Sequence, residues 1–101
     1  KHLSRCNILL HIVDITADDV VANIRQIELE LQEYSSELAA KETWLVFNKC
    51  DCLTSSEVDE KIERCLSKLD DKNGKVTRIS AISGIGTQKL ILDIANSLES
   101  D

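Results

Sequence analysis

Three runs of apolar residues alternate with three amphipathic stretches along the chain. Residues 8–15 and 43–47 are almost unbroken in apolar and β-branched side chains, which is typical of strands buried on both faces of a parallel sheet. A shorter run at 76–80 has the same character. Because a helical pattern follows each run, we predict an α/β fold in which three parallel strands alternate with three helices.

The three helical stretches are defined by apolar residues that recur every three or four positions. The first helix is expected to follow Thr16 and Asp19, which have capping-box spacing, and to end near Tyr34. Thr54 and Glu57 have the same spacing ahead of the second helix. The apolar stripes consist of Val20, Ile24, Ile27, Leu31 and Tyr34, then Val58, Ile62, Cys65, Leu66 and Leu69, and finally Leu90, Ile91, Ile94, Ala95 and Leu98.

Sequential parallel strands are expected to lie side by side with both connecting helices on one face of the sheet, because each crossover turns the same way. The third helix is then free to cover the other face. One helix covers three strands thinly, so the buried character of residues 8–15 predicts an internal strand with a further strand beside it. A turn is expected at 70–74, and residues 1–6 are expected to continue an upstream helix.

Composition is that of one small globular domain spanning residues 1–101. Hydrophobic residues make up 43% and charged residues 30%, with three glycines and no proline, so a core can form and disorder is excluded. A net charge of -6 and three aromatic residues provide neither the basic surface nor the stacking residues of a nucleic-acid-binding module. The apolar runs are far shorter than the roughly 20 residues that cross a membrane. Irregularly spaced cysteines favour reduced thiols and a cytoplasmic protein.

The candidate binding residues follow the strands. Ligands of α/β sheets bind beyond the carboxyl ends of the strands, where this chain carries Asp14 and two polar loops. In the first loop Asn48 offers a donor and an acceptor, Lys49 an aliphatic stem that can cover a flat ring, and Asp51 two acceptors. A carboxylate that accepts two parallel hydrogen bonds matches the N1 and N2 donors of guanine and rejects adenine. We therefore predict a guanine site formed by Asn48, Lys49, Asp51, Ser80, Ala81 and Ile82.

These loops resemble the motifs of a known class of nucleotide-binding proteins. Asn48-Lys49-Cys50-Asp51 resembles the NKxD guanine-specificity motif of the translation-factor-like GTPases, and Ser80-Ala81-Ile82 resembles their SAx motif, which lends backbone N–H groups to guanine O6. The amino-acid sequences of residues 9–14 and 44–49 are similar to those of the Obg (CgtA) GTPases of bacteria. The resemblance covers essentially the whole chain, as the C-terminal half of a P-loop-NTPase-like GTPase domain.

This resemblance implies a GTP-binding and GTP-hydrolysing switch protein that binds GTP and GDP with Mg²⁺ and acts on the large ribosomal subunit. The sequence departs from the family in lacking a G-x-x-x-x-G-K-[ST] phosphate loop, since the run at 84–87 is too short and has no lysine. It also has no DxxG segment ahead of the NKxD-like tetrad to hold magnesium and sense the γ-phosphate. Hydrolysis depends on positioning and charge stabilisation by those parts. We therefore assign no catalytic or metal-binding residue here, and expect the chain alone to be inactive and the activity and Mg²⁺ ligands to belong to a longer parent protein.

Alternatives remain open. The loop tetrad can occur by chance in a non-enzymatic α/β interaction or receiver-like module. Asp14, Asp18 and Asp19 suit a helix start better than a magnesium cluster, and the C-x-C pair at 50–52 lacks the second pair of a zinc site. His11 is expected to be a core histidine. The exposed edge of the first strand is expected to favour self-association.

Overall fold

A three-stranded parallel sheet organises the computed structural model, which describes residues 8–69 and 75–99. The strand order is β1-β2-β3, which confirms the predicted α/β class and the parallel arrangement of neighbouring strands. The turn predicted at 70–74 and the helix predicted at 1–6 lie outside the described residues. In chain order the elements are β1 (Ile8–Asp14), α1 (Val20–Tyr34), α2 (Ser36–Ala39), β2 (Glu42–Asn48), the 3₁₀-helix η2 (Cys50–Cys52), α3 (Ser55–Lys68), β3 (Val76–Arg78) and α4 (Thr87–Glu99).

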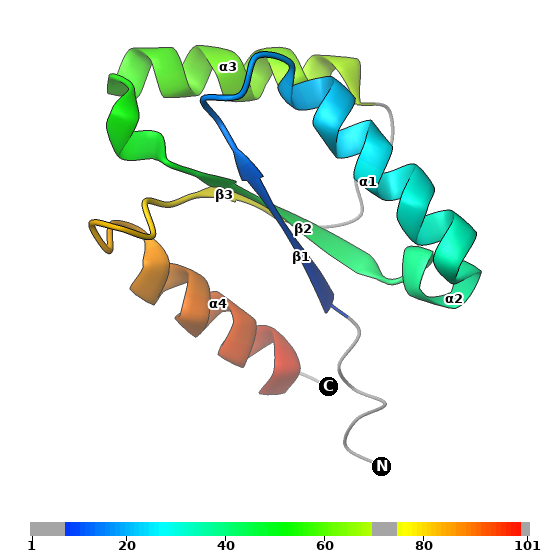
Figure 1. The fold of residues 1–101 in the computed structure, drawn as a ribbon. Helices are drawn as coiled ribbons and strands as arrows, with labels where there is room; N and C mark the ends of the chain where they lie inside the picture. The colour runs from blue at the N-terminus through cyan, green and yellow to red at the C-terminus, as the bar shows by residue number, and fades with distance from the viewer. Residues whose placement is uncertain (1–7, 70–74, 100–101) are drawn as a thin grey trace.

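The helices form two layers on opposite faces of this sheet, as Figure 1 shows. Leu45 and Phe47 of β2 belong to the core cluster formed with residues of α1 and α3. Trp44 and Val46 belong to the second cluster, to which α4 contributes Leu90. These four residues of β2 are each at most 7% exposed, because helices cover the central strand on both sides. This confirms the predicted layering of two crossover helices on one face and the last helix on the other.

Strand β1 is less buried than predicted. Leu10 and Ile12 are 41% and 55% exposed, and β1 lies at an edge of the described sheet, so the further strand predicted beside it stays a prediction. The register places these two residues beside Trp44 and Val46, on the face that α4 covers. The buried residues of the cluster around α4 come from β2, from α4 and from Ile79 just after β3. From β1, the partly buried Ile8 packs against this cluster, and the face stays open at Leu10 and Ile12.

The helix starts follow the predicted caps only in part. Thr54 and Glu57 form the complete capping box of α3, as predicted. At α1, however, the N-cap is Asp19, whose carboxylate accepts a hydrogen bond from the Ala22 N–H at 3.0 Å. Thr16 does not take part, because α1 begins only at Val20, and the Thr16 hydroxyl donates at 2.6 Å to Asp14 Oδ1 instead.

The predicted apolar stripes are buried only where a helix lies over the sheet. In α1 the buried residues are Val20 and Ile24, whereas Ile27 and Tyr34 of the same stripe are exposed. The described stripe residues of α4 divide in the same way, with Leu90 buried and Ile91 exposed. No helix in the described part of the chain is long and apolar enough to span a membrane.

We predict that Gly86→Ala destabilises the fold by about 2 to 4 kcal/mol. Gly86 has a φ of +79°, and an added Cβ would lie 2.6 Å from the carbonyl oxygen of Arg78. Gly84→Ala is the matched control, because Gly84 has a similar φ of +84° but no atom within 4 Å of the added Cβ. The control is expected to lose only about 1 to 2 kcal/mol, which is the cost of placing a residue with a Cβ atom in the left-handed conformation. Urea denaturation measures both, and equal losses would contradict the prediction.

Candidate functional site

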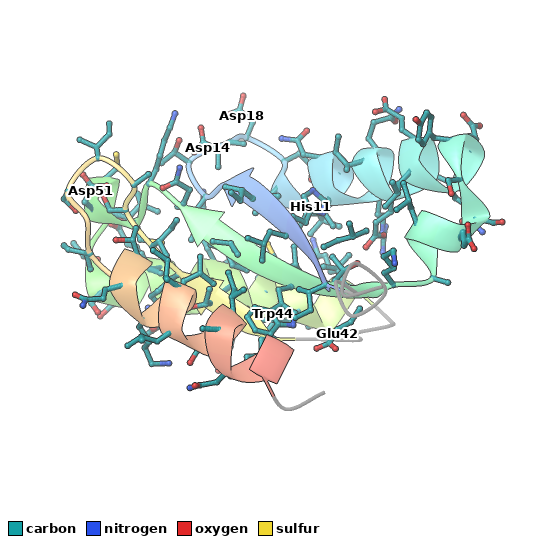
Figure 2. The ribbon with its side chains drawn as sticks, turned by 90° about the horizontal axis from the view of Figure 1, so that it is seen from below. His11, Asp14, Asp18, Glu42, Trp44 and Asp51 are labelled. Atoms are coloured by element: carbon teal, nitrogen blue, oxygen red, sulfur yellow. The ribbon has the colours of Figure 1, made fainter. Side chains whose placement is uncertain are left out.

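The carboxyl ends of the three strands bring the two predicted loops together. Asp14 and Asn48 lie opposite each other at the ends of β1 and β2, and the Ile79 N–H, just after β3, donates to the Phe47 carbonyl at 2.7 Å. The Cys50 N–H then donates back to the Ile79 carbonyl at 3.2 Å, so the backbones of the two loops are directly bonded. Figure 2 shows Asp14 and Asp51 at this end of the sheet and Glu42 at the other.

Asn48 joins the two loops through its side chain. Its Oδ1 atom accepts hydrogen bonds from the Lys49 N–H at 2.7 Å and from the Ala81 N–H at 3.0 Å. The first bond shapes the turn after β2, and the second fastens that turn to the loop after β3. The Ala81 N–H that the resemblance assigns to guanine O6 is therefore donated to Asn48 in this structure.

Asp51 faces the turn after β3. Its Oδ1 atom accepts a hydrogen bond of 2.7 Å from the hydroxyl of Ser80, which is 1% exposed. The Ser80 hydroxyl oxygen also accepts a 3.3 Å bond from the Ser83 N–H, which fixes the direction of the hydroxyl group. Asp51 itself is exposed, and a carboxylate has about four acceptor positions, so it can accept further bonds from a ligand. Ser80 thus orients Asp51 from the buried side.

Lys49 adopts an unusual backbone conformation and forms an ion pair. Its φ is +67°, and among the described residues it is the one non-glycine residue with a positive φ. Its Nζ atom lies 2.9 Å from Asp14 Oδ2, and this hydrogen bond raises the pKa of Lys49. On the other partner, hydrogen bonds from the Thr16 hydroxyl, from Lys49 and from the Thr16 N–H together lower the pKa of Asp14 to about 2.

The remaining loop residues differ in exposure. Ile82 is 92% exposed, so its side chain offers apolar surface at the edge of the site. Cys50, at the variable position of the tetrad, turns inward and its Sγ atom donates to the Phe47 carbonyl at 3.3 Å. Burial raises the pKa of the Cys50 thiol, which keeps it protonated. The described cysteines Cys50, Cys52 and Cys65 are free thiols.

Two hollows lie near the sheet. A cavity of about 210 Å³ adjoins the Asp51–Ser80 contact and is also bounded by the start of α3. A larger one of about 790 Å³ lies between α1 and the first halves of the strands and contains none of the predicted site residues. His11 lines this larger hollow, is half-buried, and has its pKa lowered chiefly by burial, against the opposing charge of Glu28. The contact between the two predicted loops therefore lies at the smaller hollow.

The structure brings together most of the predicted site. Hydrogen bonds connect Asn48 with Ala81 and Asp51 with Ser80, and Ile82 follows in the same turn. Asp14 is expected at a carboxyl strand end and near a helix start but is not included in the predicted guanine site, whereas the structure pairs it with Lys49 of that site. Within residues 8–69 and 75–99, no group of three or more histidine, cysteine or acidic side chains is arranged to hold a metal ion.

The sequence matches no model of a known protein family. The function proposed below therefore depends on the motifs and on the geometry of these loops.

We predict that Ser80→Ala destabilises the fold by about 1 to 2 kcal/mol, because the Ser83 N–H loses its acceptor and Asp51 loses a donor. Ser83→Ala is the matched control. It removes only an exposed 3.4 Å bond from the Ile85 N–H and is expected to cost less than about 0.5 kcal/mol. Urea denaturation of both variants checks this, and an equal loss in the two would contradict it.

We predict that the carboxyl group of Asp14 titrates at a pKa of about 2, below its ordinary value of 3.8. Because the pKa is lower in the folded state, the contacts of Asp14 stabilise the fold above about pH 4, and this contribution disappears as the pH falls toward 2. Thr16→Val is expected to raise the pKa more than Lys49→Met, since the Thr16 hydroxyl is the largest cause of the shift. Carbon-detected NMR titration measures the three values, and the reverse order would contradict the prediction.

Proposed function

We propose that residues 1–101 form the guanine-recognition half of a GTP-binding and GTP-hydrolysing switch protein of the Obg type. One observation carries this proposal: the Asp51 carboxylate is fixed by the Ser80 hydroxyl at the point where the NKxD-like loop meets the SAx-like turn. The strand order brings these two loops together whatever their sequence, but it does not require a hydrogen bond between the aspartate of one motif and the serine of the other. This side-chain bond supports a common role for both motifs.

In the proposed complex, Asp51 accepts hydrogen bonds from N1 and N2 of guanine. The aliphatic stem of Lys49 covers one face of the ring, and the exposed side chain of Ile82 adds apolar surface beside it. The Ala81 N–H reaches guanine O6 by sharing its hydrogen with Asn48 or by leaving Asn48. A bidentate contact of the Asp51 type discriminates between bases by about 1 to 3 kcal/mol in related base readout.

In this proposal, a part of the protein outside residues 1–101 binds the triphosphate and Mg²⁺. A phosphate loop and a DxxG segment in a longer parent protein would hold them and supply hydrolysis, so no residue here is assigned as catalytic or as a metal ligand. The large ribosomal subunit as partner and the cytoplasm as location follow from the resemblance to the Obg GTPases. For the chain alone we expect guanosine binding near 1 mM, about -4 kcal/mol, because the phosphate contacts are absent.

We predict that Asp51→Asn changes which purine nucleoside the chain prefers. The wild-type chain is expected to bind guanosine at least about tenfold more tightly than adenosine. In the variant, an amide donor replaces one acceptor, so guanosine is expected to lose about tenfold in affinity while xanthosine, which carries an acceptor at C2, gains. Nitrogen-15 NMR titration of the full chain with the three nucleosides measures these affinities.

The matched control for this experiment is Asp93→Asn on α4, which makes the same chemical change in a partly exposed ion pair with Lys89 and Lys75. It is expected to leave all three affinities unchanged. Equal binding of guanosine and adenosine by the wild-type chain would instead favour a non-enzymatic α/β interaction module.

A further inference from the structure

The ion pair between Asp14 and Lys49 connects β1 to the candidate base site. We infer that Asp14 is a positioning residue for this site: its carboxylate holds the Lys49 side chain at the end of the sheet, so that the stem of Lys49 forms one wall of the base slot. The inference rests on the proposed function, because Lys49 covers a base only if a base is bound there.

The carboxylate of Asp14 is held in one orientation. Its Oδ1 atom accepts the Thr16 N–H at 2.8 Å and the Thr16 hydroxyl at 2.6 Å, which leaves Oδ2 directed at Lys49 Nζ, 2.9 Å away. The backbones beneath are equally constrained, because Asp14 lies in register with Asn48 and the Ile15 N–H donates to the Asn48 carbonyl at 3.1 Å. Asp14 is therefore a fixed anchor rather than a mobile surface group.

Stability alone does not explain this arrangement. The two side chains are 39% and 49% exposed, and ion pairs at that exposure contribute little to folding. The positive φ of Lys49 is unfavourable for a residue with a Cβ atom, so the loop would be less strained with glycine or asparagine. Backbone strain is common at functional sites, and here it accompanies a contact that contributes little to folding. We therefore infer that the contact serves binding.

Pairing also changes what Lys49 presents to a ligand. Because its ammonium group is bound to Asp14 and its side chain is half exposed, Lys49 has methylene groups available to pack against a base. Methylene groups pack against any purine ring, whereas the choice among purines belongs to Asp51. Asp14 is therefore expected to affect the affinity for the base and to leave the selectivity unchanged.

A double-mutant cycle tests this inference. Guanosine affinity is measured by nitrogen-15 NMR titration for the full wild-type chain, Asp14→Asn, Lys49→Ala and the double variant. We expect Asp14→Asn to weaken binding about three- to tenfold and to have no further effect once Lys49 is alanine. Guanosine is uncharged, so loss of the Asp14 charge does not act on it over a distance; with guanosine monophosphate that loss would by itself strengthen binding.

Three comparisons separate a positioning role from a structural one. Asp14→Glu keeps the charge and is expected to retain most of the affinity. In an Asp51→Asn background, Asp14→Asn is expected to weaken xanthosine binding by the same factor as it weakens guanosine binding in the wild type. Without ligand, Asp14→Asn is expected to lower the pKa of Lys49, which carbon NMR of the lysine side chain reports. Asp93→Asn remains the control that should change none of these values.

The outcomes distinguish this inference from the proposed function. If the wild-type chain binds guanosine and Asp14→Asn binds it equally well, the positioning role is wrong and the guanine site stands. An undiminished effect of Asp14→Asn in the Lys49→Ala background would also overturn the role, because the effect would not pass through Lys49. If the wild-type chain shows no preference for guanosine, the proposed function fails and this inference fails with it.

Discussion

The parallel pairing of β2 with both of its neighbours is the constraint on which the rest of the structure depends. Helices cover β2 on both faces, with Trp44 and Val46 packed on one side and Leu45 and Phe47 on the other. A shift of one residue would exchange these two sets of side chains, so the core fixes the register. The same register places Asp14 opposite Asn48 and brings the loop after β3 against both, which makes the site a consequence of core packing.

The two loops then stabilise each other through polar contacts rather than through burial of apolar surface. The backbone of one loop bonds to the other at Cys50 and Ile79, and the Asp51 and Ser80 side chains add a second connection. Ser80 is a buried polar residue in this arrangement, and both hydrogen bonds of its hydroxyl group lie within the site. Because each loop satisfies groups of the other, a change in one is transmitted to both.

Local signals predicted the parts of the fold that local physics decides. The unbroken run 43–47 predicted β2, and the spacing of Thr54 and Glu57 predicted the capping box of α3, since both depend on residues close in sequence. Thr16 is not the cap because the helix begins only at Val20, directly after Asp19, and the capping-box spacing alone did not show which of its two residues starts the helix. The exposure of Ile12 on β1 could not be read from its apolar neighbours, because it depends on where α4, far along the chain, packs.

For the site, the motifs indicated which residues meet but not which bonds they make. In this structure Asp51 is already oriented by Ser80, whereas the Ala81 N–H is already donated to Asn48. Under the proposed function these two groups contribute differently to guanine recognition. Asp51 can accept the N1 and N2 donors without giving up a bond, because a carboxylate has acceptor positions to spare. Contact with O6 requires the Ala81 N–H to be shared or exchanged, which offsets part of its gain. Under the proposed function, selection of guanine over adenine is therefore expected to depend mainly on the Asp51 carboxylate, and the Ala81 N–H is expected to add less than the SAx-like motif alone suggests.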